Sequence, residues 1–112
     1  MKSAVAKTID DLREKGALSG VDLANMTAVS KATVSSWSAG KADPQHRAQL
    51  ILSELRHVVM RLAEFYAPDE TRVWLYARND LLGRRRAVDL IHEGNTEEVL
   101  VAIERLASLI YL

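Results

Sequence analysis

Residues 18–41, LSGVDLANMTAVSKATVSSWSAGK, decide how the rest of this chain folds. They contain two short segments with helical spacing, separated by Thr27-Ala28-Val29. Ser19 and Asp22 have the spacing of a capping box, in which a hydroxyl and a carboxylate satisfy free amide groups at the start of a helix. The stretch therefore predicts a helix, a three-residue turn and a second helix.

The second helix of this pair has its own start and end signals. Ser30 is placed to cap it, and Gly40 suits a left-handed residue at its exit. Two helices joined by a short turn form the helix-turn-helix unit, whose second helix enters the major groove of DNA. The side chains expected to contact DNA are Ser30, Lys31, Thr33, Ser35, Ser36 and Lys41. Only two of them are cations, so weak binding is expected, because phosphate contacts supply much of the affinity.

Further helices are predicted on both sides of this pair. Val5, Ile9 and Leu12 repeat at helical spacing before Gly16, which we expect to end the first helix. Asp43-Pro44 predicts the start of a long helix. Its apolar residues form two adjacent rows: Ala48, Leu52, Leu55, Val59, Leu62 and Tyr66, with Ile51, Val58 and Phe65 beside them. We expect this wide stripe to connect two modules and to pack against a second copy of the chain.

The second half reads as three more helices. Pro68-Asp69-Glu70 opens the first, residues 79–83 form a turn with apolar anchors before Arg84-Arg85-Arg86, and Gly94 ends a short helix. The expected buried side of the first helix is Val73, Trp74 and Ala77. The apolar stripe of the last helix is Val99, Ile103, Leu106 and Ile110. Because no segment reads as a strand, the predicted fold class is all-α.

Composition limits the possible functions. Basic and acidic residues number 15 each and cancel, which counts against nucleic acid as the only partner. From Arg56 onward every basic residue is Arg, which favours oriented, bidentate contacts and therefore an interface in the second half. Cysteine is absent, and the three histidines share no ligand spacing. We therefore expect no metal, no cofactor and no enzyme activity.

We expect neither a membrane-spanning helix nor a signal peptide from the sequence. No apolar run approaches the roughly 20 residues of a membrane-spanning helix. The N-terminal residues 1–15, MKSAVAKTIDDLREK, become charged too early for a signal peptide. The expected location is the cytoplasm, with no membrane partner.

Both halves of the chain resemble known families. Residues 19–44 resemble the DNA-binding core of Xre and phage-repressor helix-turn-helix proteins, in which Val29 and Trp37 would be core residues. Residues 70–112 resemble the toxin-binding domain of the Xre/MbcA/ParS antitoxin family. The matching features are Trp74-Leu75, Asn79, Leu82-Gly83, Asp89-Leu90-Ile91, Gly94 and the helix from Glu98-Val99. This chain has Arg84 where such domains usually have a second Gly, and Ala87 where they have Pro.

The resemblance implies a division of labour along the chain. It implies an Xre-like helix-turn-helix DNA-binding module at 1–43, a connecting helix at 44–67 and a toxin-binding domain at 68–112. Members of this family neutralise RES-domain toxins, which consume NAD, by laying the C-terminal region over the entrance to the NAD pocket. In many members the complex also represses its own promoter. The implied partners are a cognate RES-domain toxin and operator DNA, with a homodimer inside a hetero-oligomeric complex.

The residues expected to contact the toxin combine guanidinium groups with an apolar chain end. They are Asn79, Arg84, Arg85, Arg86, Ile110, Tyr111 and Leu112. Guanidinium groups would meet acidic residues at the rim of a NAD pocket, and apolar atoms would meet its ring-binding slots. The alternatives are that the arginines form a solvated turn and that the last two residues close the final helix. The alternative function is a stand-alone Xre-type transcription repressor with a C-terminal dimerisation domain.

Overall fold

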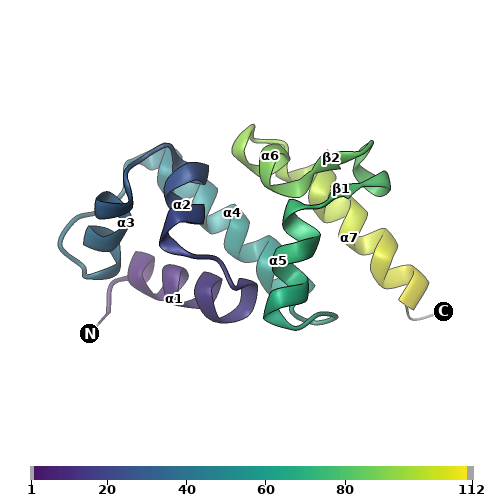
Figure 1. Cartoon of the computed structure of the whole chain (residues 1–112), viewed down its shortest axis with the longest axis horizontal. Coiled ribbons are helices and arrows are strands. Elements are labelled where there is room, and N and C mark those ends of the chain that lie inside the picture. Colours follow the sequence, from purple (N-terminus) through teal and green to yellow (C-terminus); the bar gives the residue numbers. More distant parts are fainter. Residues whose placement is uncertain (1, 111–112) are drawn as a thin grey trace.

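The computed structural model describes residues 2–110, which form helices packed around one long central helix (Figure 1). The helices are α1 (Ala4–Gly16), α2 (Gly20–Thr27), α3 (Lys31–Ser38), α4 (His46–Leu62), α5 (Pro68–Tyr76), α6 (Ala87–His92) and α7 (Thr96–Ile110). A short ribbon joins α5 to α6, and it consists of β1 (Arg78–Asn79), the 3-10 helix η1 (Asp80–Leu82) and β2 (Arg85–Arg86). The all-α prediction is confirmed. No helix among the described residues is long and apolar enough to cross a membrane.

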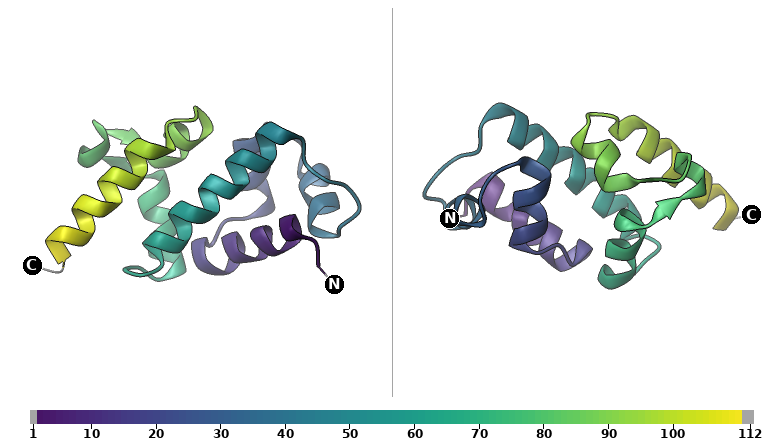
Figure 2. Two further views of the ribbon diagram at one scale, coloured as in Figure 1. Left: turned by 180° about the vertical axis from the view of Figure 1, so that it is seen from behind. Right: turned by 45° about the horizontal axis from the view of Figure 1, so that its top comes forward.

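Helix α4 lies between the two halves of the chain. Helices α1 to α3 pack on one side of it and α5 to α7 on the other (Figures 1 and 2). Helix α7 runs beside α4 in the same direction, as two contacts show. Thr96 donates a hydrogen bond to Glu54, and farther along both helices Glu104 pairs with Arg61. The last turns of α7 extend beyond α4 and α5 in every view (Figure 2).

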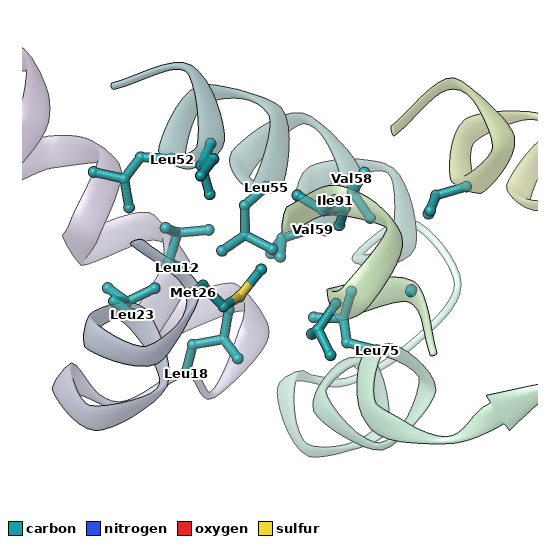
Figure 3. Packing of buried hydrophobic residues seen from close by; sticks show 14 of the residues in the cluster. Leu12, Leu18, Leu23, Met26, Leu52, Leu55, Val58, Val59, Leu75 and Ile91 are labelled. Atoms are coloured by element: carbon teal, nitrogen blue, oxygen red, sulfur yellow. The ribbon is translucent and has the colours of Figure 1, made fainter. Parts of the chain in front are cut away.

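One hydrophobic cluster runs through both halves. Leu12 and Leu23 reach it from the first half and Leu75 from the second, while Leu55 and Val59 of α4 fill the space between them (Figure 3). The side chains of Leu55 and Val59 are 0% exposed. The stripe of α4 is therefore covered within the chain. The expectation that this stripe packs against a second copy is wrong, because a buried surface has nothing left to offer a partner.

Helix α1 ends at Gly16, as predicted, but the left-handed turn falls on the next residue. Gly16 is still helical, and Ala17 takes the left-handed conformation with φ 52°. A Cβ atom on Gly16 would lie 3.2 Å from both methyl groups of Val59. The glycine is needed because α1 crosses α4 closely there, and the turn itself is made by another residue.

The ends of α4 also differ from the prediction. The helix begins at His46 behind Gln45, two residues after the expected Asp43-Pro44 start. Pro44 is buried, and its carbonyl accepts a hydrogen bond from the Gln49 side chain at 2.9 Å, so it belongs to the connection between helices. At the other end the helix stops at Leu62. The expected last residues, Phe65 and Tyr66, lie in the following turn, partly buried against the core.

The buried side of α5 was predicted wrongly. Its buried residues are Thr71 and Leu75, whereas Val73 is 66% exposed and Ala77 lies after the helix in an extended conformation. Trp74 is partly buried against the core. Positions 71 and 75 are one helical turn apart and share a face. The sequence pattern did not identify that face, because Val73, Trp74 and Leu75 are three consecutive apolar residues and the other buried residue is a polar threonine.

The ribbon contains the strand pairing that the sequence did not predict. Arg78 pairs with Arg86 and Asn79 with Arg85 in antiparallel register. The Asn79 side chain accepts a hydrogen bond from the Leu81 amide at 2.9 Å and starts η1. Gly83 and Arg84 then take consecutive left-handed conformations, with φ 67° and 65°. Arg84 thus adopts a backbone conformation that favours glycine, the residue expected at this position from the resemblance described above.

Candidate functional site

Helices α2 and α3, the predicted helix-turn-helix pair, are built by local caps. The Ser19 hydroxyl accepts from the Asp22 amide at 3.2 Å, and the Asp22 carboxylate accepts from the Ser19 amide at 2.7 Å. Ala28 makes the turn with φ 59°. The Ser30 hydroxyl then accepts from the Thr33 amide at 3.1 Å and starts α3. These contacts join groups within four residues of one another, which is why the sequence could predict where both helices begin.

The residues expected to contact DNA divide into two groups. Lys31, Ser35 and Lys41 are exposed, with Ser36 partly exposed. The hydroxyls of Ser30 and Thr33 instead bond each other at 2.9 Å as part of the cap. The opposite face of α3 is fixed in the core by Trp37 and Val34, which are 3% and 0% exposed. Helix α3 therefore presents short polar side chains and a single lysine of its own to solvent.

A further cation lies next to α3. A Cβ atom on Gly20 would be 3.5 Å from Arg13 Nη2 and 3.8 Å from Lys31 Cγ, so both basic side chains pass the start of α2. Sequence reasoning did not select Arg13, because it belongs to α1 and comes near Lys31 only when the helices pack. Arg13 adds a second charge to the same surface.

In the second half, the three consecutive arginines have different surroundings. The side chain of Arg84 is 85% exposed and lies 3.8 Å from Asp80. Arg85 pairs with Glu98 on α7 at 3.2 Å. Arg86 donates two hydrogen bonds to Asp89, at 2.8 and 2.9 Å. These bonds hold the pKa of Asp89 below its ordinary value. The prediction grouped these arginines, but the ribbon sends them to separate partners.

The end of α7 carries an apolar stripe that leaves the core. Val99 and Ile103 are 0% exposed, Leu106 is partly buried, and Leu109 and Ile110 are 66% and 50% exposed. The stripe continues at helical spacing past the point where α4, α6 and the ribbon cover it. The two remaining predicted residues, Tyr111 and Leu112, lie outside the described residues.

The structure does not bring the arginines and the end of α7 together. Arg85 contacts α7 at Glu98, and Ile110 lies twelve residues farther on, which is about 18 Å along a helix. Two shallow grooves of about 450 and 300 Å³ occupy the outer side of α7 and share Glu97 and Val101. The first borders the ribbon, and the second reaches Ser108. The candidate surface is therefore an elongated strip along α7.

Comparison with known proteins identifies the family. No family model matches the chain. The probable mycobacterial cidal antitoxin Rv3188 of Mycobacterium tuberculosis (strain ATCC 25618 / H37Rv) is 32% identical to it over 99 residues, 88% of this chain and 84% of that protein. The chain belongs to the mycobacterial cidal antitoxin family. The mycobacterial cidal antitoxin MbcA of the same strain is 29% identical over 110 residues, 98% of this chain and 97% of that protein.

A solved structure supports the same family. The crystal structure of the M. tuberculosis MbcT-MbcA toxin-antitoxin complex contains a chain that matches this one with a TM-score of 0.85 and 29% identity. The match covers 98% of this chain and 99% of that one. The all-α architecture of this mycobacterial cidal antitoxin family member, including both halves, is therefore shared with a solved protein.

One cluster in this family member was missed by sequence reasoning. The buried carboxylate of Asp22 accepts hydrogen bonds from Tyr76 Oη at 2.8 Å and Arg72 Nη2 at 3.1 Å, and both donors belong to α5. Burial alone would raise the pKa of Asp22, but the bonds from Arg72, Ser19 and Tyr76 outweigh it and hold that pKa well below its ordinary 3.8. Burial and the bond to Asp22 raise the pKa of Tyr76 to about 12. The only sequence signal was a capping acid on a face that α5 later covers.

Proposed function

We propose that this protein is an antitoxin that binds and neutralises a RES-domain toxin, an enzyme that consumes NAD. The observation that carries the proposal is the match, over nearly the whole chain, to a protein solved inside a toxin-antitoxin complex. In this proposal residues 1–43 are the DNA-binding module, 44–67 the connecting helix and 68–112 the toxin-binding domain. The protein acts by occupying a surface and performs no reaction of its own.

The proposed mode of inhibition is steric. The exposed stripe of Leu109 and Ile110 enters the apolar part of the toxin's NAD pocket, with Tyr111 and Leu112 beyond it. The guanidinium groups of Arg84 to Arg86, together with Asn79, contact acidic or polar groups at the rim. Support comes from the exposure of this helix end, since an apolar surface gains stability when a partner removes it from water. A blocked pocket keeps NAD out without any change in the toxin's catalytic groups.

A matched pair of variants tests this mode. Leu109 on α7 and Val73 on α5 are both apolar and both 66% exposed, so Glu at either position changes the isolated protein similarly. Each variant is expressed with the protein encoded by the adjacent reading frame, and cellular NAD is measured. We expect Leu109→Glu and deletion of residues 108–112 to lose protection of NAD, and Val73→Glu to keep it. Full protection by the truncated protein would reject the proposed mode, and failure to bind that neighbour would reject the proposed toxin.

We also propose that α3 binds operator DNA and that the complex regulates its own promoter. Support comes from the rigid caps of α2 and α3 and from the exposed Lys31, Ser35 and Lys41. Binding to the upstream DNA is measured over a series of salt concentrations. Removing a phosphate contact with Lys31→Ala should lower the salt slope by about 0.9, whereas Lys7→Ala on α1 should leave it unchanged. Equal affinity for upstream and scrambled DNA would contradict the proposal.

The proposed DNA-binding form is a homodimer within a larger hetero-oligomeric complex. Helix-turn-helix proteins that read two half-sites usually bind as dimers. The apolar stripe of α4 is buried within the chain, so the second copy must use another surface. Light scattering on the isolated protein and on its complex gives the mass of each. A monomer in both would refute the homodimer.

A further inference from the structure

The first turn of α2 is held by both halves of the chain at once. Asp22 is 7% exposed, and its carboxylate accepts from Ser19 of its own helix at 2.7 Å and from Tyr76 of α5 at 2.8 Å. Arg72 of α5 supplies the opposite charge. A buried carboxylate is stable only while charged and polar partners surround it. The start of the helix-turn-helix pair therefore depends on the position of two α5 side chains.

Tyr76 connects this contact to the ribbon. Two guanidinium groups lie over its ring, that of Arg72 at 4.8 Å and that of Arg86 at 5.8 Å from the ring centre. The hydroxyl at the end of the same ring donates to Asp22. Arg86 is the last ribbon residue before α6, and its side chain is 40% exposed. A partner's carboxylate at the ribbon can therefore reach Arg86 and compete there with Asp89, which accepts two hydrogen bonds from this guanidinium. Asp22 stays buried at the other end of the Tyr76 side chain.

We propose that Tyr76 couples the ribbon to the helix-turn-helix pair, so that a protein partner whose carboxylate takes Arg86 away from the ring loosens the first turn of α2. Arg86 helps to hold the ring in the position from which its hydroxyl reaches Asp22. Without that position, Asp22 loses a buried donor and the capping box at Ser19 weakens. The biological use of this coupling rests on the proposed function. In an antitoxin, toxin contact at the ribbon would alter DNA binding. Because coupling between two sites is reciprocal, DNA binding would also alter toxin contact.

The test needs neither toxin nor DNA, so its failure is distinct from a failure of the proposed function. Arg86→Ala removes the guanidinium that a partner would take. Amide hydrogen exchange is followed at Leu23, whose amide donates to the Ser19 carbonyl at 3.1 Å. The amide of Gln49 at the start of α4 reports any general loss of stability. We expect Arg86→Ala to speed exchange at Leu23 relative to Gln49 by about fivefold or more, the lower end of typical coupling between sites.

Two controls isolate the role of Tyr76. Arg85→Ala removes the neighbouring arginine, which pairs with Glu98, and should change exchange at Leu23 less than twofold. In a Tyr76→Phe background, which lacks the hydroxyl, Arg86→Ala should also have less than a twofold effect, whereas a Tyr66→Phe background should keep the full effect. Equal effects of Arg85→Ala and Arg86→Ala, or an undiminished effect in Tyr76→Phe, would overturn the proposal. Should Tyr76→Phe not fold, the two arginine variants decide alone.

Discussion

The hydroxyl of Tyr76 donates a hydrogen bond to the carboxylate of Asp22 over 2.8 Å, although the two residues stand 54 positions apart in the chain. Together with Arg72, this bond joins the helix-turn-helix pair to the second half through a buried charge. A buried charge makes the contact sensitive to substitution and to pH. Several consequences of the packing around this contact and elsewhere can be measured on the isolated protein.

Acid should destabilise the protein through Asp22. Its pKa is lower in the folded protein than the ordinary value of 3.8, so the unfolded chain takes up a proton first as the pH falls. The stabilisation by Asp22 is present above pH 5 and is lost progressively below pH 4. Asp22→Asn should lose about 2 kcal/mol at pH 7 and show a shallower decline in acid. Urea unfolding between pH 7 and pH 3 measures both, and Asp69→Asn, an exposed acid on α5, should behave as wild type.

Replacing Gly16 with alanine should destabilise the protein by about 1 kcal/mol, because the new methyl group meets Val59. Val59 is fully buried and β-branched, so it has no free rotamer with which to move away. In a Val59→Ala background the same change should instead stabilise by up to about 1 kcal/mol, the usual gain of alanine over glycine in a helix. Thermal or urea unfolding of the wild type, the two single variants and the double variant gives the coupling free energy between positions 16 and 59 directly. Additive effects would show that α1 and α4 adjust easily at this crossing.

Replacing Arg84 with glycine should stabilise the protein by about 0.5–1 kcal/mol. The left-handed conformation at φ 65° strains a residue with a side chain by about 1–2 kcal/mol, and the extra freedom of glycine in the unfolded chain offsets part of this gain. Arg84→Ala keeps the strain and removes the same charge, so it should not stabilise. A melting temperature that rises equally in both variants would mean that charge, and not backbone conformation, is responsible.

Ile103 and Leu109 of the α7 stripe should contribute very differently to the free energy of unfolding. Ile103→Ala leaves a cavity in the core and should lower the free energy of unfolding by about 2–4 kcal/mol. Leu109→Ala removes a side chain that is 66% exposed and should change it by less than about 0.5 kcal/mol. Chemical unfolding of the isolated protein measures both values. A large effect at Leu109 would mean that the helix end belongs to the folded core and is not free for a partner.

Local signals in the sequence predicted the local structure well. The Ser19 and Ser30 caps and the left-handed Gly40 and Gly94 are all confirmed. Each depends on groups within a few residues of one another, so the chain around them needs no knowledge of the rest of the fold. The helix-turn-helix pair, the short α6 and the long final helix could therefore be predicted.

Contacts between distant segments could not be predicted in the same way. The prediction of the buried face of α5 was wrong, because the helices packed against α5, and not its own sequence pattern, place Thr71 inside and Val73 outside. The ribbon was missed because two paired residues per strand leave no periodic pattern. The roles assigned to Asn79, the three arginines and the end of α7 stay predictions, and the structure does not bring the arginines and the helix end together.

The sequence by itself determined which segments are helical, where most of them begin and end, and that the chain is all-α, because caps, glycines and apolar spacing act over a few residues. Only the tertiary structure decided that the apolar stripe of α4 is buried inside the chain and that Gly16 lies where α1 crosses α4 closely. It also decided that Asp22 is held by Arg72 and Tyr76. Those outcomes depend on which surfaces meet when two halves pack. A buried charge or a close crossing exists only once both sides are in place.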